Sequence, residues 1–317
     1  MSMCLAMFIR LRQSSGVGWR SVVISHPACL QREKFALLIK QEQSVRVPFE
    51  DIAIIVLNHR EISLTHPVLS ACGEYGISLF ATGETHHPNG VFLPYLQHSR
   101  ATRVLRQQLA LPRPLAKRIW AAIVRAKINN QAHCLDLTGM EGGKKLVAYA
   151  KQVRSGDSTM MESQAAAFYF ARLFGHHFRR SQLIWTNAAL NYGYAILRGA
   201  IARGLVTHGF FPSLGLHHAS EQNAFNLADD LIEPFRPLVD IYVASLCDDD
   251  ARSLTPSDKI NLVALLNADI DMPRGRMAVL AAIEQCVESL ARALDQRKSN
   301  AIELPVLTGF EQHIAEN

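Results

Sequence analysis

Short hydrophobic runs separated by turn-forming residues mark the first part of the chain. The runs are rich in β-branched and aromatic residues, and Gly, Pro, Asn and His are frequent between them, as is typical of strands joined by turns. The predicted strands cover residues 21–25, 35–39, 52–57, 77–81 and 91–93. A helix is predicted over residues 66–75. The pattern indicates a small sheet-rich domain.

After residue 97 the hydrophobic spacing becomes that of amphipathic helices. The predicted helices cover residues 101–128, 143–154, 158–174, 188–205, 223–246, 258–268 and 275–297. A chain of 317 residues is long enough to form two domains. We therefore predict an α+β protein, with a loose N-terminal extension (1–18), a small β-rich domain (19–98) and a larger all-helical domain (99–317).

Positive charge is concentrated at the start of the helical part. The net charge of the chain is +5, but Arg100 to Lys127 contain eight Lys or Arg residues and no Asp or Glu. Leu105, Leu109 and Trp120 are interleaved with these charges. Two interpretations remain open, namely a helical surface that faces nucleic-acid phosphates and a solvated basic helix face.

Several protein classes are disfavoured. The six cysteines are scattered and form no Cys-x-x-Cys pair, which argues against a zinc knuckle and is typical of reduced thiols in a cytoplasmic protein. No apolar run reaches the roughly 20 residues that span a bilayer, so no membrane association is predicted. The phosphate-binding loop, the Gly-x-Ser-x-Gly motif and the dinucleotide fingerprint are missing from the sequence.

An acidic cluster with helical spacing follows Asn226. Asp230 and Glu233 are three residues apart, and Asp229 and Glu233 are four apart. Either aspartate can therefore share a helix face with Glu233, and the spacing does not decide between them. Neighbouring carboxylates repel each other, and a divalent cation would relieve that repulsion. The alternative is a solvated acidic helix end with Arg236 as its ion-pair partner.

Two adjacent histidines precede this cluster. The stretch from Gly209 to His218 is rich in turn-forming residues and brings His217 and His218 beside the acidic helix. Consecutive residues of an extended segment point in opposite directions, so at most one of the two is expected to face the carboxylates. That histidine is either a metal ligand or a structural residue.

Glu162 is the single acid of an alanine-rich helix. It is either a functional carboxylate or a favourable charge in a first helical turn capped by Ser158 or Thr159. A later helix contains Asn187 and Asn191, four residues apart, which are expected to hydrogen-bond across a site or to cap neighbouring backbone.

Four motifs in one order resemble the CRISPR-associated protein 1 family, the integrase of spacer acquisition. They are the Glu162 helix, "NAALNYGYAILR" from Asn187, Pro212-x-Leu-Gly-x-x-His218, and "NLADDLIEPFRPLVD" from Asn226; "HPNGVFLPY" fits as well. The resemblance extends from Trp19 onward and is greatest to the branch that accompanies Cas9-type systems. The 18 residues before Trp19 depart from the family pattern and put the start codon in question.

The resemblance implies a catalytic metal triad of Glu162, His218 and Glu233, loaded with Mg²⁺ or Mn²⁺. His218 is chosen over His217 because it stands six residues after Pro212. Asp230 matches a second acidic position that supports the site.

The implied activity is insertion of short foreign DNA fragments as new spacers into a CRISPR array by 3′-hydroxyl transesterification. Arg179 and Arg180 are candidate contacts to the DNA backbone. The implied partners are double-stranded DNA, a second copy of this chain bound through the β-rich domain, and a dimer of CRISPR-associated protein 2. Two alternatives remain, a structure-specific DNA repair nuclease with the same metal ligands and a non-catalytic DNA-bridging module.

Overall fold

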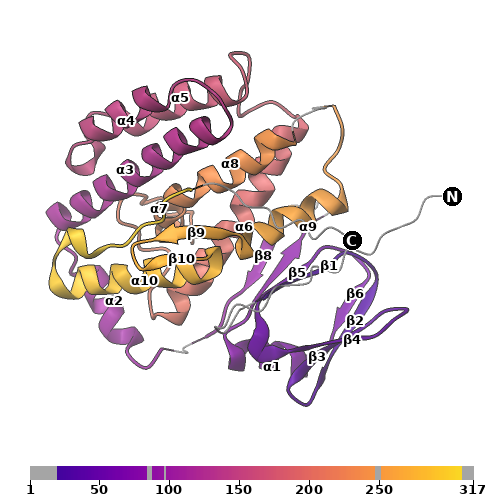
Figure 1. The fold of residues 1–317 in the computed structure, drawn as a ribbon. Helices are drawn as coiled ribbons and strands as arrows, with labels where there is room; N and C mark the ends of the chain where they lie inside the picture. Colours follow the sequence, from indigo (N-terminus) through magenta and orange to yellow (C-terminus); the bar gives the residue numbers. More distant parts are fainter. Residues whose placement is uncertain (1–19, 84–87, 96–97, 247–250, 309–317) are drawn as a thin grey trace.

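The N-terminal part is built from short strands and one helix (Figure 1). The structure, a computed structural model, describes residues 20–83, 88–95, 98–246 and 251–308. The N-terminal elements are β1 (Arg20–Ile24), β2 (Ala28–Glu33), β3 (Ala36–Lys40), β4 (Val45–Pro48), the 3-10 helix Phe49–Asp51, β5 (Ile52–Leu57), β6 (Ile62–Leu64), α1 (His66–Tyr75), β7 (Ser78–Thr82) and β8 (Pro88–Phe92). The strands form two four-stranded sheets, ordered β1-β5-β7-β8 and β4-β3-β2-β6.

Strand β5 contributes to two hydrophobic cores. Ile54 and Val56 belong to the large core of the helical part, whereas Ile52 and Ile55 belong to the core between the two sheets and α1. β5 pairs in parallel with β1 and β7, and a central parallel strand buried on both faces is hydrophobic throughout. The β1-β5-β7-β8 sheet therefore lies between the second sheet and the helices.

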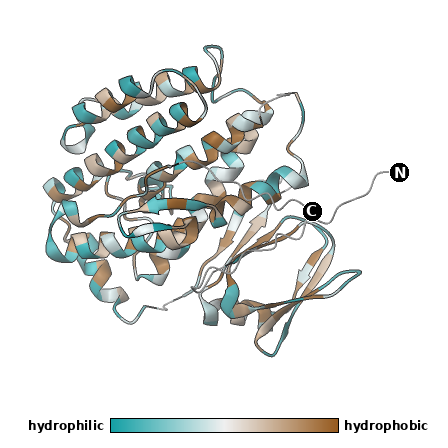
Figure 2. Ribbon diagram, viewed as in Figure 1, coloured by the Kyte–Doolittle hydropathy of each residue, from teal (hydrophilic) through white to brown (hydrophobic). Residues whose placement is uncertain are grey.

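The second part is mainly helical, with α3, α4 and α5 packed together at one side (Figure 1). Its elements are α2 (Ala101–Leu109), α3 (Arg113–Leu137), α4 (Gly143–Gln152), the 3-10 helix Ser155–Asp157, α5 (Met161–Leu173), α6 (Trp185–Thr207), α7 (Asn226–Leu231), the 3-10 helix Glu233–Phe235, α8 (Arg236–Ser245), α9 (Pro256–Ala264), the 3-10 helix Leu265–Asn267, β9 (Asp269–Met272), β10 (Gly275–Ala278), α10 (Val279–Gln296) and the 3-10 helix Ser299–Ala301. Figure 2 shows that hydrophilic and hydrophobic residues alternate along the outer helices, as one-sided burial requires.

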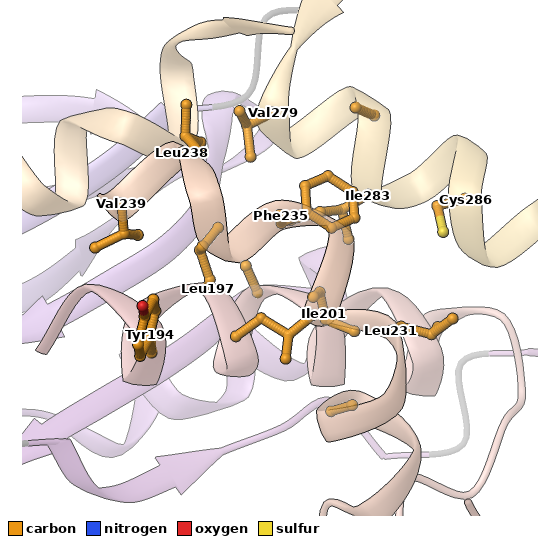
Figure 3. Close-up of a cluster of buried hydrophobic side chains, with 14 of the residues drawn as sticks. Tyr194, Leu197, Ile201, Leu231, Phe235, Leu238, Val239, Val279, Ile283 and Cys286 are labelled. Atoms are coloured by element: carbon orange, nitrogen blue, oxygen red, sulfur yellow. The ribbon is translucent and has the colours of Figure 1, made fainter. Parts of the chain in front are cut away.

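Helix α6 lies at the centre of the helical core. Figure 3 shows Leu197 and Ile201 of α6 in a buried cluster with Phe235, Leu238 and Ile283. Side chains of α8, α9 and α10 pack against the same helix. Because α6 touches so many elements, its position affects most of the helical part.

Two glycines let α6 approach its neighbours closely. A Cβ atom at Gly193 would overlap the side chain of Val239 on α8, so this glycine allows α6 and α8 to pack closely. A Cβ atom at Gly199 would overlap the ring of Phe80 on β7. The second contact joins α6 to the β1-β5-β7-β8 sheet, so a side chain at Gly199 must displace the Phe80 ring or the helix itself.

The predicted α+β class is confirmed, and several element boundaries were wrong. Strands β2, β4 and β6 were not predicted, and the helix predicted over 101–128 is divided before Arg113, where Pro112 lacks the N–H that a continuous helix requires. Strand β10 occupies the start of the helix predicted over 275–297, and its antiparallel partner β9 lies in the gap before that helix, so the second part is not all-helical. The helix predicted over 223–246 is interrupted at Ile232.

The three domain limits stay predictions, and the extension over 1–18 lies outside the described residues. Within the described ranges, no helix combines the length and the apolar character that a membrane crossing requires.

Candidate metal centre

One ammonium group holds two glutamates together inside the helical part. The Nζ atom of Lys127, on α3, lies 2.7 Å from Oε1 of Glu162, on α5, and forms a second ion pair with Oε2 of Glu233. The other oxygen of Glu233 accepts a hydrogen bond of 2.8 Å from Nε of Arg236. Lys127 is 8% exposed and Glu233 is 4% exposed, so water and salt screen these ion pairs little.

Burial and charge act in opposite directions on this cluster. Burial alone would raise the pKa of Glu233, but Lys127 and Arg236 lower the pKa of Glu233 to about 2. Burial alone would lower the pKa of Lys127, but Glu233 and Glu162 hold that pKa above its usual value. Lys127 and Glu233 are therefore charged at neutral pH. The prediction that Glu233 belongs to a solvated acidic helix end is wrong, because its side chain is buried. The predicted ion pair between Glu233 and Arg236 is present.

Glu162 lies in the first turn of α5, as the structural interpretation of this residue predicted. The N-cap residue of α5 is Met160, and the carboxylate of Asp157 accepts hydrogen bonds of 3.0 Å from the backbone N–H groups of Met161 and Glu162. The predicted cap by Ser158 or Thr159 is wrong. Asp157 and Met160 both have left-handed backbone (φ of 50° and 53°), which is uncommon for residues other than glycine.

His218 is held by Asp230. Its Nδ1 lies 2.8 Å from Oδ1 of Asp230, and the same carboxylate accepts backbone hydrogen bonds from Leu216, His217 and His218. Asp230 is fully buried. The hydrogen bond to Asp230 raises the pKa of His218; burial opposes this, and the charges of Asp230, Glu233 and Asp229 add to it.

The remaining candidates of this segment have other partners. The ring of His217 stacks on Trp120, with centroids 4.3 Å apart and an angle of 1° between the planes. Asp229 forms an ion pair of 3.1 Å with Arg198. Of the two histidines, His218 is the one bound to an acidic side chain, which agrees with the expectation that they point in different directions.

The donors in this cluster fit a hard divalent cation. The Lys127 ammonium stands in for a cation between the carboxylates of Glu162 and Glu233. Asp230 holds one ring nitrogen of His218, an arrangement common among metal-binding histidines. Oxygen donors with one imidazole suit Mg²⁺ or Mn²⁺. Within the described residues, no three His, Cys, Asp or Glu side chains are already grouped closely enough to hold a metal ion.

A pocket of about 200 Å³ adjoins Glu233. Its lining includes Lys127, Gln131, Arg180, Glu233 and Asp240. The guanidinium of Arg180 is fixed at this pocket by two asparagines of α6, since it donates hydrogen bonds of 2.8 Å to Oδ1 of Asn187 and 2.6 Å to Oδ1 of Asn191. The expected Asn pair therefore positions an arginine.

Arg179, the other candidate DNA contact, bonds the backbone oxygens of His176 and Phe178. It is exposed and does not line the pocket beside Glu233. The structure thus brings Arg180, and not Arg179, to the pocket beside Glu233.

Sequence reasoning assigned Lys127 to the wrong group. It was counted with the basic block, but it lies on the buried face of α3 with Trp120, Ile123 and Val124. Its helical spacing from those apolar residues was a usable signal. The other seven basic residues of the block are exposed, and Arg106 and Arg118 form no ion pair within the described part of the chain.

Comparison with known proteins identifies the family. Residues 22–261 match the family described as CRISPR associated protein Cas1. The chain is 42% identical over 299 residues to the CRISPR-associated endonuclease Cas1 of Neisseria meningitidis serogroup C (strain 8013), covering 93% of this chain and 98% of the relative.

Two solved structures share the fold. A casposase bound to integration product matches with a TM-score of 0.72 and 18% identity, over 88% of this chain and 91% of that one. A Cas6-RT-Cas1–Cas2 complex matches with a TM-score of 0.68 and 18% identity, over 90% of this chain and 36% of the longer chain. The family prediction is confirmed, and the chain belongs to the CRISPR-associated Cas1 proteins.

Proposed function

We propose that this Cas1 protein joins the 3′-hydroxyl ends of short DNA fragments to a CRISPR array at the centre formed by Glu162, His218 and Glu233. Its general role, an endonuclease and integrase of spacer acquisition, follows from family membership. The observation that carries the proposed site is the convergence of two glutamates on one cation, Lys127, beside a histidine held by a buried aspartate.

The proposed reaction is a phosphodiester transesterification. A 3′-oxygen of the fragment forms a new bond to a phosphorus of the array, the bond from that phosphorus to its own 3′-oxygen breaks, and the proton of the attacking hydroxyl passes to the leaving oxygen or to water. A bound Mg²⁺ or Mn²⁺ supplies Lewis acidity for the phosphate oxygens. Glu162, Glu233 and the free ring nitrogen of His218 would hold the ion, and Asp230 keeps the imidazole oriented.

DNA contact is proposed for the exposed basic face of α2 and α3 and for Arg180. Phosphate contacts of this kind position a duplex without reading its sequence. The casposase neighbour is bound to an integration product and another neighbour contains Cas2. We propose a homodimer joined to Cas2 for this chain, in a Cas9-type system, because one protomer with one centre joins only one end.

Strand joining tests the proposal. The purified chain, alone and with its Cas2 partner, would be incubated with short 3′-hydroxyl duplexes, a repeat-containing plasmid and Mn²⁺. Glu162→Gln should abolish the joined product while DNA binding stays within about twofold, because the amide keeps the size of the side chain and an oxygen that accepts the hydrogen bond of Lys127. Exposed Glu221 offers a control, since Glu221→Gln should join DNA like the wild type.

Two other outcomes would favour the alternatives. Metal-dependent cutting that releases ends without joining them would support a repair nuclease. Unchanged activity in Glu162→Gln would refute the assigned centre, and DNA binding with no product in any condition, Cas2 included, would support a bridging module.

A further inference from the structure

Lys127 is the cation that keeps the two glutamates together. Its ammonium contacts both Glu162 and Glu233, while its stem lies on the buried face of α3. Without a cation, the buried carboxylate of Glu233 and the part-buried carboxylate of Glu162 would repel each other, and the lost solvation of Glu233 would be uncompensated. A divalent ion that binds the same oxygens must therefore displace this ammonium.

Gln131 offers the displaced ammonium a new partner. It lies four residues after Lys127, which places both side chains on one face of α3. Gln131 is 2% exposed, yet its Oε1 atom accepts no hydrogen bond. A buried acceptor without a donor is costly and uncommon in folded proteins. The Oε1 atom of Gln131 is therefore an available acceptor for a hydrogen-bond donor that moves next to it.

The pocket of about 200 Å³ connects the two positions. Lys127 and Gln131 both line it, together with Glu233 and Asp240. One helical turn along α3 is about 5.4 Å, a distance that the four-carbon stem of a lysine spans by rotation. The pocket gives the ammonium room to move, and the carboxylate of Asp240 gives it a negative neighbour.

We propose that Lys127 is a positioning residue that occupies the metal position in the metal-free protein and turns toward Gln131 when a divalent ion binds Glu162 and Glu233. This inference rests on the proposed metal centre. Lys127 keeps the carboxylates in place before loading, and it competes with the incoming ion. Removing Lys127 should therefore lower the stability of the metal-free fold and raise the affinity for the metal ion.

Mn²⁺ titration calorimetry and thermal unfolding, without and with Mn²⁺, test this exchange. Lys127→Met should lower the melting temperature of the metal-free protein and tighten Mn²⁺ binding by about tenfold, the factor expected for removal of one competing charge-assisted bond. Lys117→Met is the matched control, because Lys117 is an exposed lysine of the same helix, and it should change neither quantity.

Gln131→Leu provides a second test that does not disturb the carboxylates. It should leave the metal-free melting temperature unchanged or raised, because Oε1 has no partner to lose, and should weaken Mn²⁺ binding by roughly fivefold. Combined with Lys127→Met, the Gln131→Leu change should have no further effect on Mn²⁺ affinity. This dependence would separate an exchange between Lys127 and Gln131 from two independent effects on folding.

The outcomes separate this inference from the proposed function. Unchanged or weaker Mn²⁺ binding in Lys127→Met would refute the exchange. So would a Gln131→Leu change that lowers the Mn²⁺ affinity equally in the wild type and in Lys127→Met. If Lys127→Met does not fold, unchanged Mn²⁺ affinity in Gln131→Leu alone refutes it. Wild-type protein that binds no Mn²⁺ would refute the metal centre as well. Glu162-dependent strand joining with Mn²⁺ affinities unaffected by either change would retain the function and refute only the exchange.

Discussion

Asp240 of α8 is a buried carboxylate whose replacement should change how stability depends on pH. It is 1% exposed and accepts hydrogen bonds from the hydroxyl groups of Tyr169, at 2.9 Å, and Tyr194. Burial raises the pKa of Asp240 from 3.8 to about 6, even though the two hydroxyl groups and the charge of Arg236 act to lower it. The perturbation that we consider is Asp240→Asn, which removes the titrating group and keeps the shape.

The difference in pKa sets the magnitude of the effect. Ionising Asp240 costs about 3 kcal/mol more in the folded state than in the unfolded state, since each tenfold change in proton affinity corresponds to about 1.4 kcal/mol. Between pH 3.8 and about 6, the folded state keeps a proton that the unfolded state has released. The free energy of unfolding therefore falls as pH rises through this window and is constant above it.

Urea unfolding from pH 4.5 to 7.5 measures this effect. The free energy of unfolding of the wild type, minus that of Asp240→Asn, should fall by about 2 kcal/mol across the range, most of it below pH 6.5. Asp136→Asn removes an exposed aspartate and should give a difference that stays flat over the same range. A wild-type advantage over Asp240→Asn that is independent of pH, or that grows with pH, would refute the reasoning.

Three further predictions concern packing, positioning and DNA binding. Gly199→Ala should lower the free energy of unfolding by about 1–3 kcal/mol through overpacking, whereas Gly73→Ala, whose added Cβ meets no atom within 4 Å, should be neutral or stabilising in the same urea titration. Asp230→Ala should cost roughly 3 kcal/mol, about 1 kcal/mol for each backbone N–H left without its acceptor; an unchanged unfolding midpoint would contradict this. Arg106→Glu with Arg118→Glu should weaken binding to duplexes of any sequence and lower the salt slope by about two, measured by fluorescence anisotropy.

The fold class followed from hydrophobic spacing, but short elements did not. Strand β5 is a continuous apolar run and was predicted at its observed bounds. Strand β6 has three residues, too few to show alternation. The hairpin of β9 and β10 had a readable signal, because Pro273 and Gly275 mark a turn between two short segments. Gly275 adopts a φ of +121° there, which excludes most other residues.

The site was only partly predictable for a different reason. Spacing showed which acidic residues share a helix face, but the partner of each one depends on how separate helices pack. Asp229 and Asp230 are adjacent in the sequence, yet Asp229 pairs with Arg198 and Asp230 with His218. A count of charges along the chain also treats Lys127 like its exposed neighbours, although its burial decides what it binds.

Helix α6 mechanically connects the β-rich part to the proposed metal centre. Gly199 lets it contact the ring of Phe80 in the sheet, and the preceding residue, Arg198, pairs with Asp229, next to the aspartate that holds His218. A shift of α6 would thus move the support of the proposed metal ligand. Errors of about 1 Å in such positioning reduce reaction rates by roughly a hundredfold. The sheet contact at Gly199 therefore constrains the chemistry of the centre as well as the stability of the fold.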